Sequence, residues 1–166
     1  MQAVDDDLRR AQGDLRSEQE HSQALQTALD TRPETISIFK NISGVEVSLR
    51  DKDLALTVAS DLLFNSGSAS LKNSAKSTLG QVASALNSTY PNQSIVIIGY
   101  TDTDQIKKSS FKSNWHLAFD RAWSVRDYLV SQGVNKDRIA IESWGPTKPL
   151  ATKAASRRVD IVVVDD

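Results

Sequence analysis

Two short stretches of the chain alternate apolar and polar residues, and a polar turn separates them. The apolar positions are Val45, Val47 and Leu49, then Leu54, Leu56 and Val58, with "RDKD" in between. Alternation of this kind places every second side chain on the same face of a β-strand. The pattern therefore predicts two neighbouring strands joined by a turn, followed by a loop at "NSGSAS".

Two later stretches carry apolar residues at helical spacing instead. The first stripe consists of Leu71, Ala75, Leu79, Val82 and Leu86, and the second of Ala118, Ala122, Val125 and Leu129. Steps of three and four residues align side chains along one side of an α-helix. Asn114 is a good N-cap for the second helix, and Gly133 fits its C-terminal cap.

Three further segments have the composition of strands. "SIVIIG" at 94–99 is apolar throughout, which is typical of a buried central strand. "RIAIESWG" at 138–145 and the closing "RRVDIVVVDD" are the other two, and alternate positions of the last share one face. The element order is ββαβαββ, which predicts an α+β fold with helices packed on one face of a mixed β-sheet.

The residues before these strands have the heptad pattern of a coiled coil. Six of eight seam positions are apolar in the series Val4, Leu8, Ala11, Leu15, Glu18, Ser22, Leu25 and Leu29. We predict a helical coiled-coil leader at 1–32, a linker at 33–44 and a globular domain at 45–166. The leader either forms a homodimer through residues 4–29 or lies on its own domain as a single exposed helix.

Composition and charge narrow the possible functions. Of the 166 residues, 39% are hydrophobic and 25% charged, and the net charge is −1, which argues against nucleic-acid or membrane-surface binding. The chain has no cysteine and two distant histidines, so we predict no metal site and no cofactor. It opens in what resembles the middle of a helix, so we expect membrane attachment only through segments missing from this chain.

The candidate chemistry lies around the strand at 94–99. Asp102 and Asp104 follow this strand, and Arg121 lies on the second turn of the next helix. If the helix packs beside the strand, the acid and the base converge. A carboxylate can hold an ammonium while a guanidinium grips a carboxylate, so the pair suits an amino-acid-like zwitterion. The alternative is an ordinary salt bridge between Asp102 and Arg121.

Several ordered motifs give the chain a resemblance to a known family. They are "LLFNSGSASL", "IIGYTD", "SNWHLAFDRAWSVRDYLVSQGV", "RIAIESWGPTKPLA" and "SRRVDIVVV", which together span about residues 45–164. The segment resembles the OmpA-like peptidoglycan-binding domain, the family that includes the C-terminal domains of OmpA, Pal and MotB. The "SNW" spelling and the longer loop before it favour MotB-like members over Pal.

This resemblance implies a ligand, a role and a location. The ligand is the peptidoglycan stem peptide, chiefly its diaminopimelate residue, which keeps a free ammonium and carboxylate. By the resemblance, Asp102 and Arg121 are its two principal contacts. The other positions that match the family's motifs are Asn114, Leu117, Thr101 and Arg157. The domain is then not an enzyme. It anchors a cell-envelope protein or complex to the wall from the periplasm, membrane-anchored in the full-length protein.

Some positions depart from the family pattern, and other functions compete with this one. Ala118 replaces the usual serine, Ser156 an asparagine, and Tyr100 the commoner histidine, while "ESWGP" replaces a Gly-x-Gly-Glu spelling. "DTD" after an apolar strand imitates the Asp-x-Asp of metal-dependent phosphatases. A third possibility is a scaffold whose coiled coil acts while the domain only packs. Trp115, Trp123 and Trp144 offer a sugar-stacking platform, although such rings more often pack or lie singly at the surface.

Overall fold

The computed structural model describes residues 2–30, 33–106 and 110–165, without the side chains of residue 2 and residues 24–35. The chain divides into two compact units, residues 1–36 and residues 37–166, and each is described by itself. Across the described residues, no helix combines the length and the apolar character that crossing a bilayer requires.

The first unit is dominated by helix α1 (Gln2–Asp30), which covers the predicted leader. Its seam residues Val4, Leu8 and Leu15 are exposed, at 71%, 56% and 57% of their surface. The seam leucines at 25 and 29 lie outside the side chains that the structure describes. Helix α1 is therefore present, and the seam residues in its N-terminal half are exposed. The homodimer stays a prediction.

A second helix lies in the segment predicted as a linker. Helix α2 (Pro33–Lys40) ends with Phe39 fully buried, and the Phe39 ring stacks on Tyr90 with 6.2 Å between the centroids. Ile42 is buried as well. This segment thus contributes to the core, and the predicted domain boundaries at 33 and 45 stay a prediction.

The second unit contains a five-stranded mixed sheet with strand order β1-β2-β5-β3-β4. The strands are β1 (Val45–Arg50), β2 (Asp53–Ala59), β3 (Ile95–Tyr100), β4 (Ile139–Gly145) and β5 (Arg158–Val163). All neighbours are antiparallel except β3 and β4, which are parallel because helix α5 carries the chain between them. The predicted α+β fold with a mixed sheet is confirmed.

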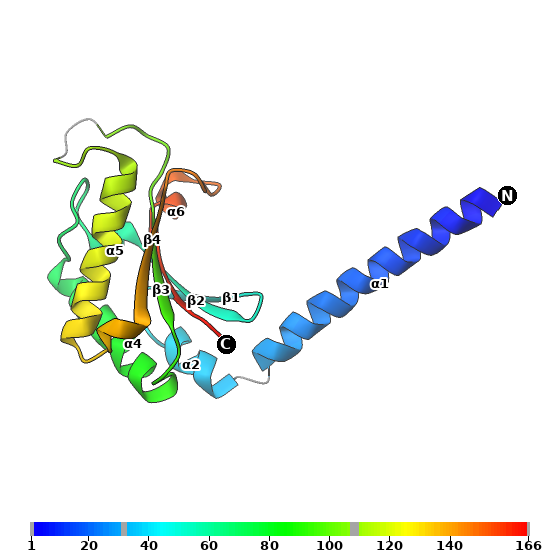
Figure 1. Ribbon diagram of the computed structural model, residues 1–166, viewed down its shortest axis with the longest axis horizontal. Helices are drawn as coiled ribbons and strands as arrows, with labels where there is room; N and C mark the ends of the chain where they lie inside the picture. Colours follow the sequence, from blue (N-terminus) through cyan, green and yellow to red (C-terminus); the bar gives the residue numbers. More distant parts are fainter. Residues whose placement is uncertain (1, 31–32, 107–109, 166) are drawn as a thin grey trace. The chain divides into compact units, whose positions relative to one another are not determined.

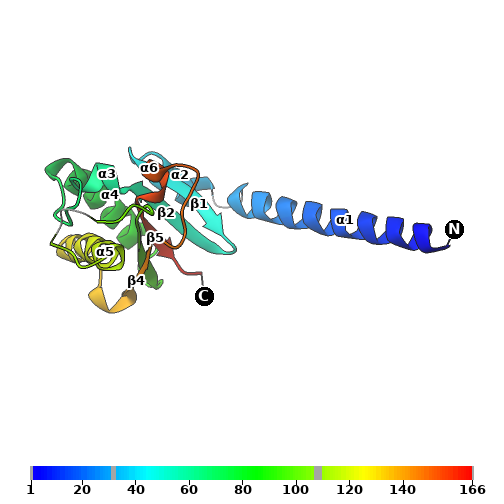
Figure 2. The same cartoon turned by 90° about the horizontal axis from the view of Figure 1, so that it is seen from above.

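The two long helices of this unit lie against one face of the sheet, whereas the short helix α6 (Lys153–Ser156) lies on its other side (Figure 1). The two long ones are α4 (Asn73–Thr89) and α5 (Asn114–Ser131), and the other short ones are α3 (Ser60–Leu63) and η1 (Lys136–Arg138). Helix α5 packs on β3 and β4, and α4 packs beside α5 (Figure 2). The core between them contains the register-matched row Leu56, Ile161 and Ile97, all fully buried.

The ends of α5 show one confirmed and one wrong expectation. Gly133 has a φ of +99° and its amide closes the C-terminal turn onto Val130, as predicted. The N-cap is Ser113 rather than Asn114: its extended backbone leaves the hydroxyl free to accept a bond from the His116 amide. Asn114 is therefore the first residue of the helix, and its side chain is available for another contact.

The opposite face of the sheet carries a polar cluster beside an apolar one, which consists of Ala55, Ile98, Tyr100 and Val162. The Asp160 carboxylate is fully buried, forms an ion pair with Arg50 and accepts a 2.7 Å bond from the Thr57 hydroxyl. The Tyr100 ring lies beneath the Arg158 guanidinium at 3.8 Å, and burial raises the pKa of its phenol. Tyr100, at the family's usual histidine position, thus packs on this face of the sheet.

Gly99 sets how closely α5 approaches β3. A Cβ at this position would lie 2.1 Å from the Ala118 carbonyl oxygen and 2.7 Å from its carbon. Only glycine leaves room for the helix backbone to lie directly on the strand. This approach places the first two turns of α5 beside the loop that leaves β3, where the candidate site lies.

Candidate functional site

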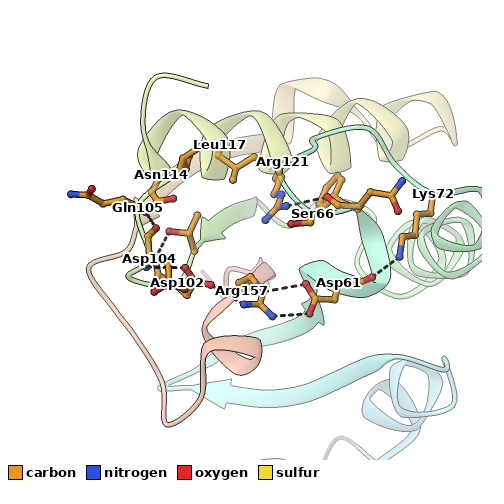
Figure 3. A pocket seen from close by; sticks show the side chains of 15 residues that line it. Asp61, Ser66, Lys72, Asp102, Asp104, Gln105, Asn114, Leu117, Arg121 and Arg157 are labelled. Atoms are coloured by element: carbon orange, nitrogen blue, oxygen red, sulfur yellow. Dashed lines mark hydrogen bonds and ion pairs between the residues drawn. The ribbon is translucent and has the colours of Figure 1, made fainter. Parts of the chain in front are cut away.

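A pocket of about 630 Å³ lies between the loop after β3, the first turns of α5 and the loop before α4 (Figure 3). All six residues that the resemblance marked line it: Thr101, Asp102, Asn114, Leu117, Arg121 and Arg157. The charged lining side chains are three acids, Asp61, Asp102 and Asp104, and three bases, Lys72, Arg121 and Arg157. The pocket therefore holds both signs of charge in equal number.

The acidic end is held in place by backbone contacts. Asp102 Oδ1 accepts a 3.0 Å bond from the Asp104 amide, which fixes the turn that follows the strand. Thr101 is buried, and its amide donates to Gly145 on β4 at 2.8 Å. Asn114 is not the N-cap of α5, and its side-chain amide instead donates to the Asp104 carbonyl at 2.8 Å. The loop is thus tied both to the sheet and to α5.

Arg157 joins two acids across the lower side of the pocket. Its guanidinium donates to Asp102 Oδ2 at 2.8 Å and to the two Asp61 oxygens at 3.2 and 3.0 Å. The bonds from Arg157 lower the pKa of the Asp61 carboxyl, and the two carboxylates raise the pKa of Arg157 far above its ordinary value. Sequence reasoning missed Asp61, because nothing in "ASDLLF" marks it as facing a residue 96 positions away.

Arg121 lies on the opposite wall and differs from Arg157 in its partners. Its Nε donates to the Ser68 carbonyl at 2.9 Å, and its Nη2 to the Asn65 carbonyl at 3.5 Å. The residue is 4% exposed, its guanidinium lies 5.2 Å from the Phe64 ring centroid, and burial lowers its pKa. Among the described residues, no carboxylate forms an ion pair with Arg121.

The interpretation of Asp102 and Arg121 as a direct salt bridge is therefore wrong. Asp102 pairs with Arg157, and Arg121 keeps guanidinium donors for a ligand while its neighbours are neutral carbonyls. A buried cation without a carboxylate is costly unless something supplies the missing charge. The pocket can accept a carboxylate at Arg121 and a cationic group at the Asp102 end.

The described residues offer no group of three or more histidines, cysteines or acids positioned to hold a metal ion. Asp104 of the "DTD" motif pairs with Lys153 at 2.9 Å, and Asp102 pairs with Arg157. The two aspartates of the phosphatase-like motif are thus engaged by cationic side chains.

Fold and pocket together define a small α+β domain with a pocket that is lined by side chains of both charges. The chain belongs to the OmpA family, whose model matches residues 63–159. The probable lipoprotein YiaD of Escherichia coli (strain K12) is 35% identical over 127 residues, which are 73% of this chain and 56% of that protein. Outer membrane protein A of Escherichia coli O157:H7 is 38% identical over 57% of this chain and 26% of its own length. The chain thus spans about half or less of these two relatives.

Solved structures show the same fold. The periplasmic domain of Helicobacter pylori MotB superposes with a TM-score of 0.71 at 27% identity, covering 78% of this chain and 84% of that domain. The cell wall anchor of the type VI secretion system from Pseudomonas aeruginosa superposes with a TM-score of 0.68 at 27% identity, covering 86% of this chain and 97% of that one. The similarity to MotB-like members predicted from the sequence is confirmed.

Proposed function

We propose that this domain binds peptidoglycan noncovalently through the diaminopimelate of its stem peptide, and so anchors a cell-envelope protein or complex to the wall. The observation that carries the proposal is the buried guanidinium of Arg121, which lines the pocket without a carboxylate partner among the described residues. Membership of the OmpA family supports it, and so does the similarity to a structure described as a cell wall anchor.

Each side chain has a distinct role in this proposal. Arg121 binds the distal carboxylate of diaminopimelate through paired hydrogen bonds, a geometry that a planar guanidinium favours. Asp102 accepts bonds from the distal ammonium, and its contact with Arg157 holds the carboxylate at the pocket wall. Leu117 contributes an apolar wall on α5, while Thr101 and Asn114 hold the loop.

No bond of the ligand is made or broken in this proposal, and no cofactor takes part. The periplasm is the compartment where the ligand is accessible. The names of the relatives, an outer membrane protein and a probable lipoprotein, support an envelope location. A parallel dimer through residues 4–29 would present two wall-binding heads and would strengthen attachment by avidity.

The test is retention of the chain by purified sacculi, combined with titration of a soluble muropeptide that contains diaminopimelate. Removing one partner of a charge-assisted contact costs about 1.5–3 kcal/mol, so Asp102→Ala and Arg121→Ala should each lose about tenfold or more in affinity. Asp127→Ala is the control, because Asp127 is an exposed acid of the same helix outside the pocket.

Equal retention of all four proteins would reject the site. If the variants lose sacculus binding and the wild type cleaves the muropeptide during incubation, the domain is an enzyme and not an anchor. If no protein binds sacculi while the chain still dimerises, the coiled-coil scaffold becomes the better function.

A further inference from the structure

A second hollow adjoins the proposed stem-peptide pocket. It measures about 470 Å³ and is lined by residues that include Gly67, Ser70, Asp120, Trp123 and Ser124. Gly67 lines both hollows, so the loop at 65–70 is the wall between them.

This dividing loop is fixed to α5 from both sides. Arg121 holds the Ser68 carbonyl at 2.9 Å from the side of the first pocket. One turn further along the helix, the Ser124 hydroxyl donates to the Ala69 carbonyl at 2.5 Å. The relative position of the two hollows is therefore set by the same helix, and a ligand with two linked parts would meet a preformed pair of sites.

Trp123, which lines the second hollow, is the last of three exposed aromatic side chains on α5. Trp115, Phe119 and Trp123 are 44%, 43% and 47% exposed, and they follow one another at steps of four residues, about 6 Å apart along the axis. The Phe119 and Trp123 rings stack at 6.4 Å with 22° between their planes. Single exposed rings are common, but the stacked pair of Phe119 and Trp123, with the Arg126 guanidinium 4.9 Å from the Trp123 ring centroid, makes a larger exposed surface that is typical of a binding site.

The chemistry of the second hollow matches a saccharide. Sugars present apolar C–H faces that pack on aromatic rings and hydroxyl groups that need donors and acceptors around their edge. Trp123 supplies the ring, Asp120 an exposed carboxylate, and Ser70 and Ser124 hydroxyl groups. Such a mixture of one aromatic wall and a few polar groups is typical of a site that orients a small ligand.

We propose that this hollow, with Trp123 as its central ring, is a subsite for the glycan backbone of the wall polymer. The inference deepens the proposed function and rests on it, because the stem peptide is covalently attached to the sugar. A stem bound beside Arg121 brings its own sugar close to the dividing loop, where the second contact costs little additional entropy. The row of rings along α5 then extends the surface for neighbouring sugars.

The experiment measures the affinity of the whole chain for three probes. They are the free stem tripeptide ending in diaminopimelate, the same stem attached to its disaccharide, and glycan strands from which all stems have been removed. The variants are Trp123→Ala and the conservative Trp123→Phe. Trp144→Ala is the matched control, because Trp144 is 37% exposed on β4 and lies outside both hollows.

We expect the wild type to bind the disaccharide stem about threefold to tenfold more tightly than the free stem, the range of one aromatic contact. Trp123→Ala should remove this advantage and glycan binding while leaving the affinity for the free stem unchanged. Trp123→Phe should keep most of the advantage, and Trp144→Ala should behave as the wild type.

Equal wild-type affinity for the two stem probes would overturn the sugar subsite, as would an unchanged advantage in Trp123→Ala. After either result, a protein partner would be the better explanation for the exposed aromatic side chains of α5. Failure of the proposed function looks different: the free stem would not bind, whereas glycan strands that bind in a Trp123-dependent way would still support the subsite. Absence of binding to every probe would overturn both.

Discussion

Replacing Gly99 with alanine tests whether the close approach of α5 to β3 builds the pocket. The new Cβ would lie 2.1 Å from the Ala118 carbonyl oxygen, about 1.3 Å short of ordinary contact. The obstacle is helix backbone, so no side chain can rotate out of the way. Overpacking of a core typically costs about 1–3 kcal/mol, and we expect the upper end, about 3 kcal/mol.

The assay is urea unfolding followed by far-ultraviolet circular dichroism, with the melting temperature measured in parallel. A loss of this size should lower the melting temperature by about 10 °C for a domain of this length. Muropeptide affinity should fall as well, because α5 carries Arg121 while β3 leads into Asp102, and a displaced helix changes the distance between them.

Gly80→Ala is the matched control for this substitution. Gly80 lies inside α4, and its added Cβ would meet nothing closer than 3.9 Å. Alanine should therefore stabilise the helix by about 0.5–1 kcal/mol without affecting binding. A Gly99→Ala protein that loses less than about 0.5 kcal/mol would refute the reasoning, because the helix would then not depend on contact with that strand.

Three further predictions concern other parts of the chain. Asp160→Ala should cost about 2–3 kcal/mol in urea unfolding, somewhat below a fully buried pair because Arg50 is partly exposed, and an unchanged midpoint would contradict it. The pKa of Asp61 is lowered in the folded protein, so its contribution to stability is present above about pH 4 and disappears as the pH falls through the folded pKa. Asp61→Asn should therefore slightly reduce the loss of stability between about pH 4 and lower pH. An unaltered dependence of stability on pH would argue against the contact with Arg157. Light scattering should show a dimer for the whole chain and a monomer for one starting at residue 33, and two monomers at high micromolar concentration would remove the coiled coil as an oligomeriser.

Local sequence patterns predict much of the sheet, and they also predict that Asp102 and Arg121 belong to one site. Alternation along β2 is a period-two signal, and the short continuous apolar run of β3 is typical of a buried strand; both lie in the folded core. Asp102 and Arg121 were expected on one site because a strand end and the next helix lie together in this kind of fold, and both line the same pocket.

Other features depend on information that a linear pattern does not carry. The bridge from Arg157 to Asp61 and Asp102 joins residues 96 and 55 positions apart, so only the closed sheet brings them together. The choice of Ser113 over Asn114 as N-cap depends on which backbone is extended, a difference of one residue that composition cannot resolve. Alternation along β5 does put Asp160 on the face opposite Val159 and Ile161, but it does not show that this carboxylate is buried and paired with Arg50 and Thr57 of two other strands.

The most direct test of the central claim uses two stem peptides that differ by one carboxylate. Diaminopimelate carries a distal carboxylate that lysine lacks, so a lysine stem removes only the group assigned to Arg121. Calorimetric titration of the wild type should show about tenfold or greater preference for the diaminopimelate stem. Arg121→Gln should bind both stems with similar, weaker affinity. Equal binding of the two stems by the wild type, or an undiminished preference in Arg121→Gln, would contradict the account.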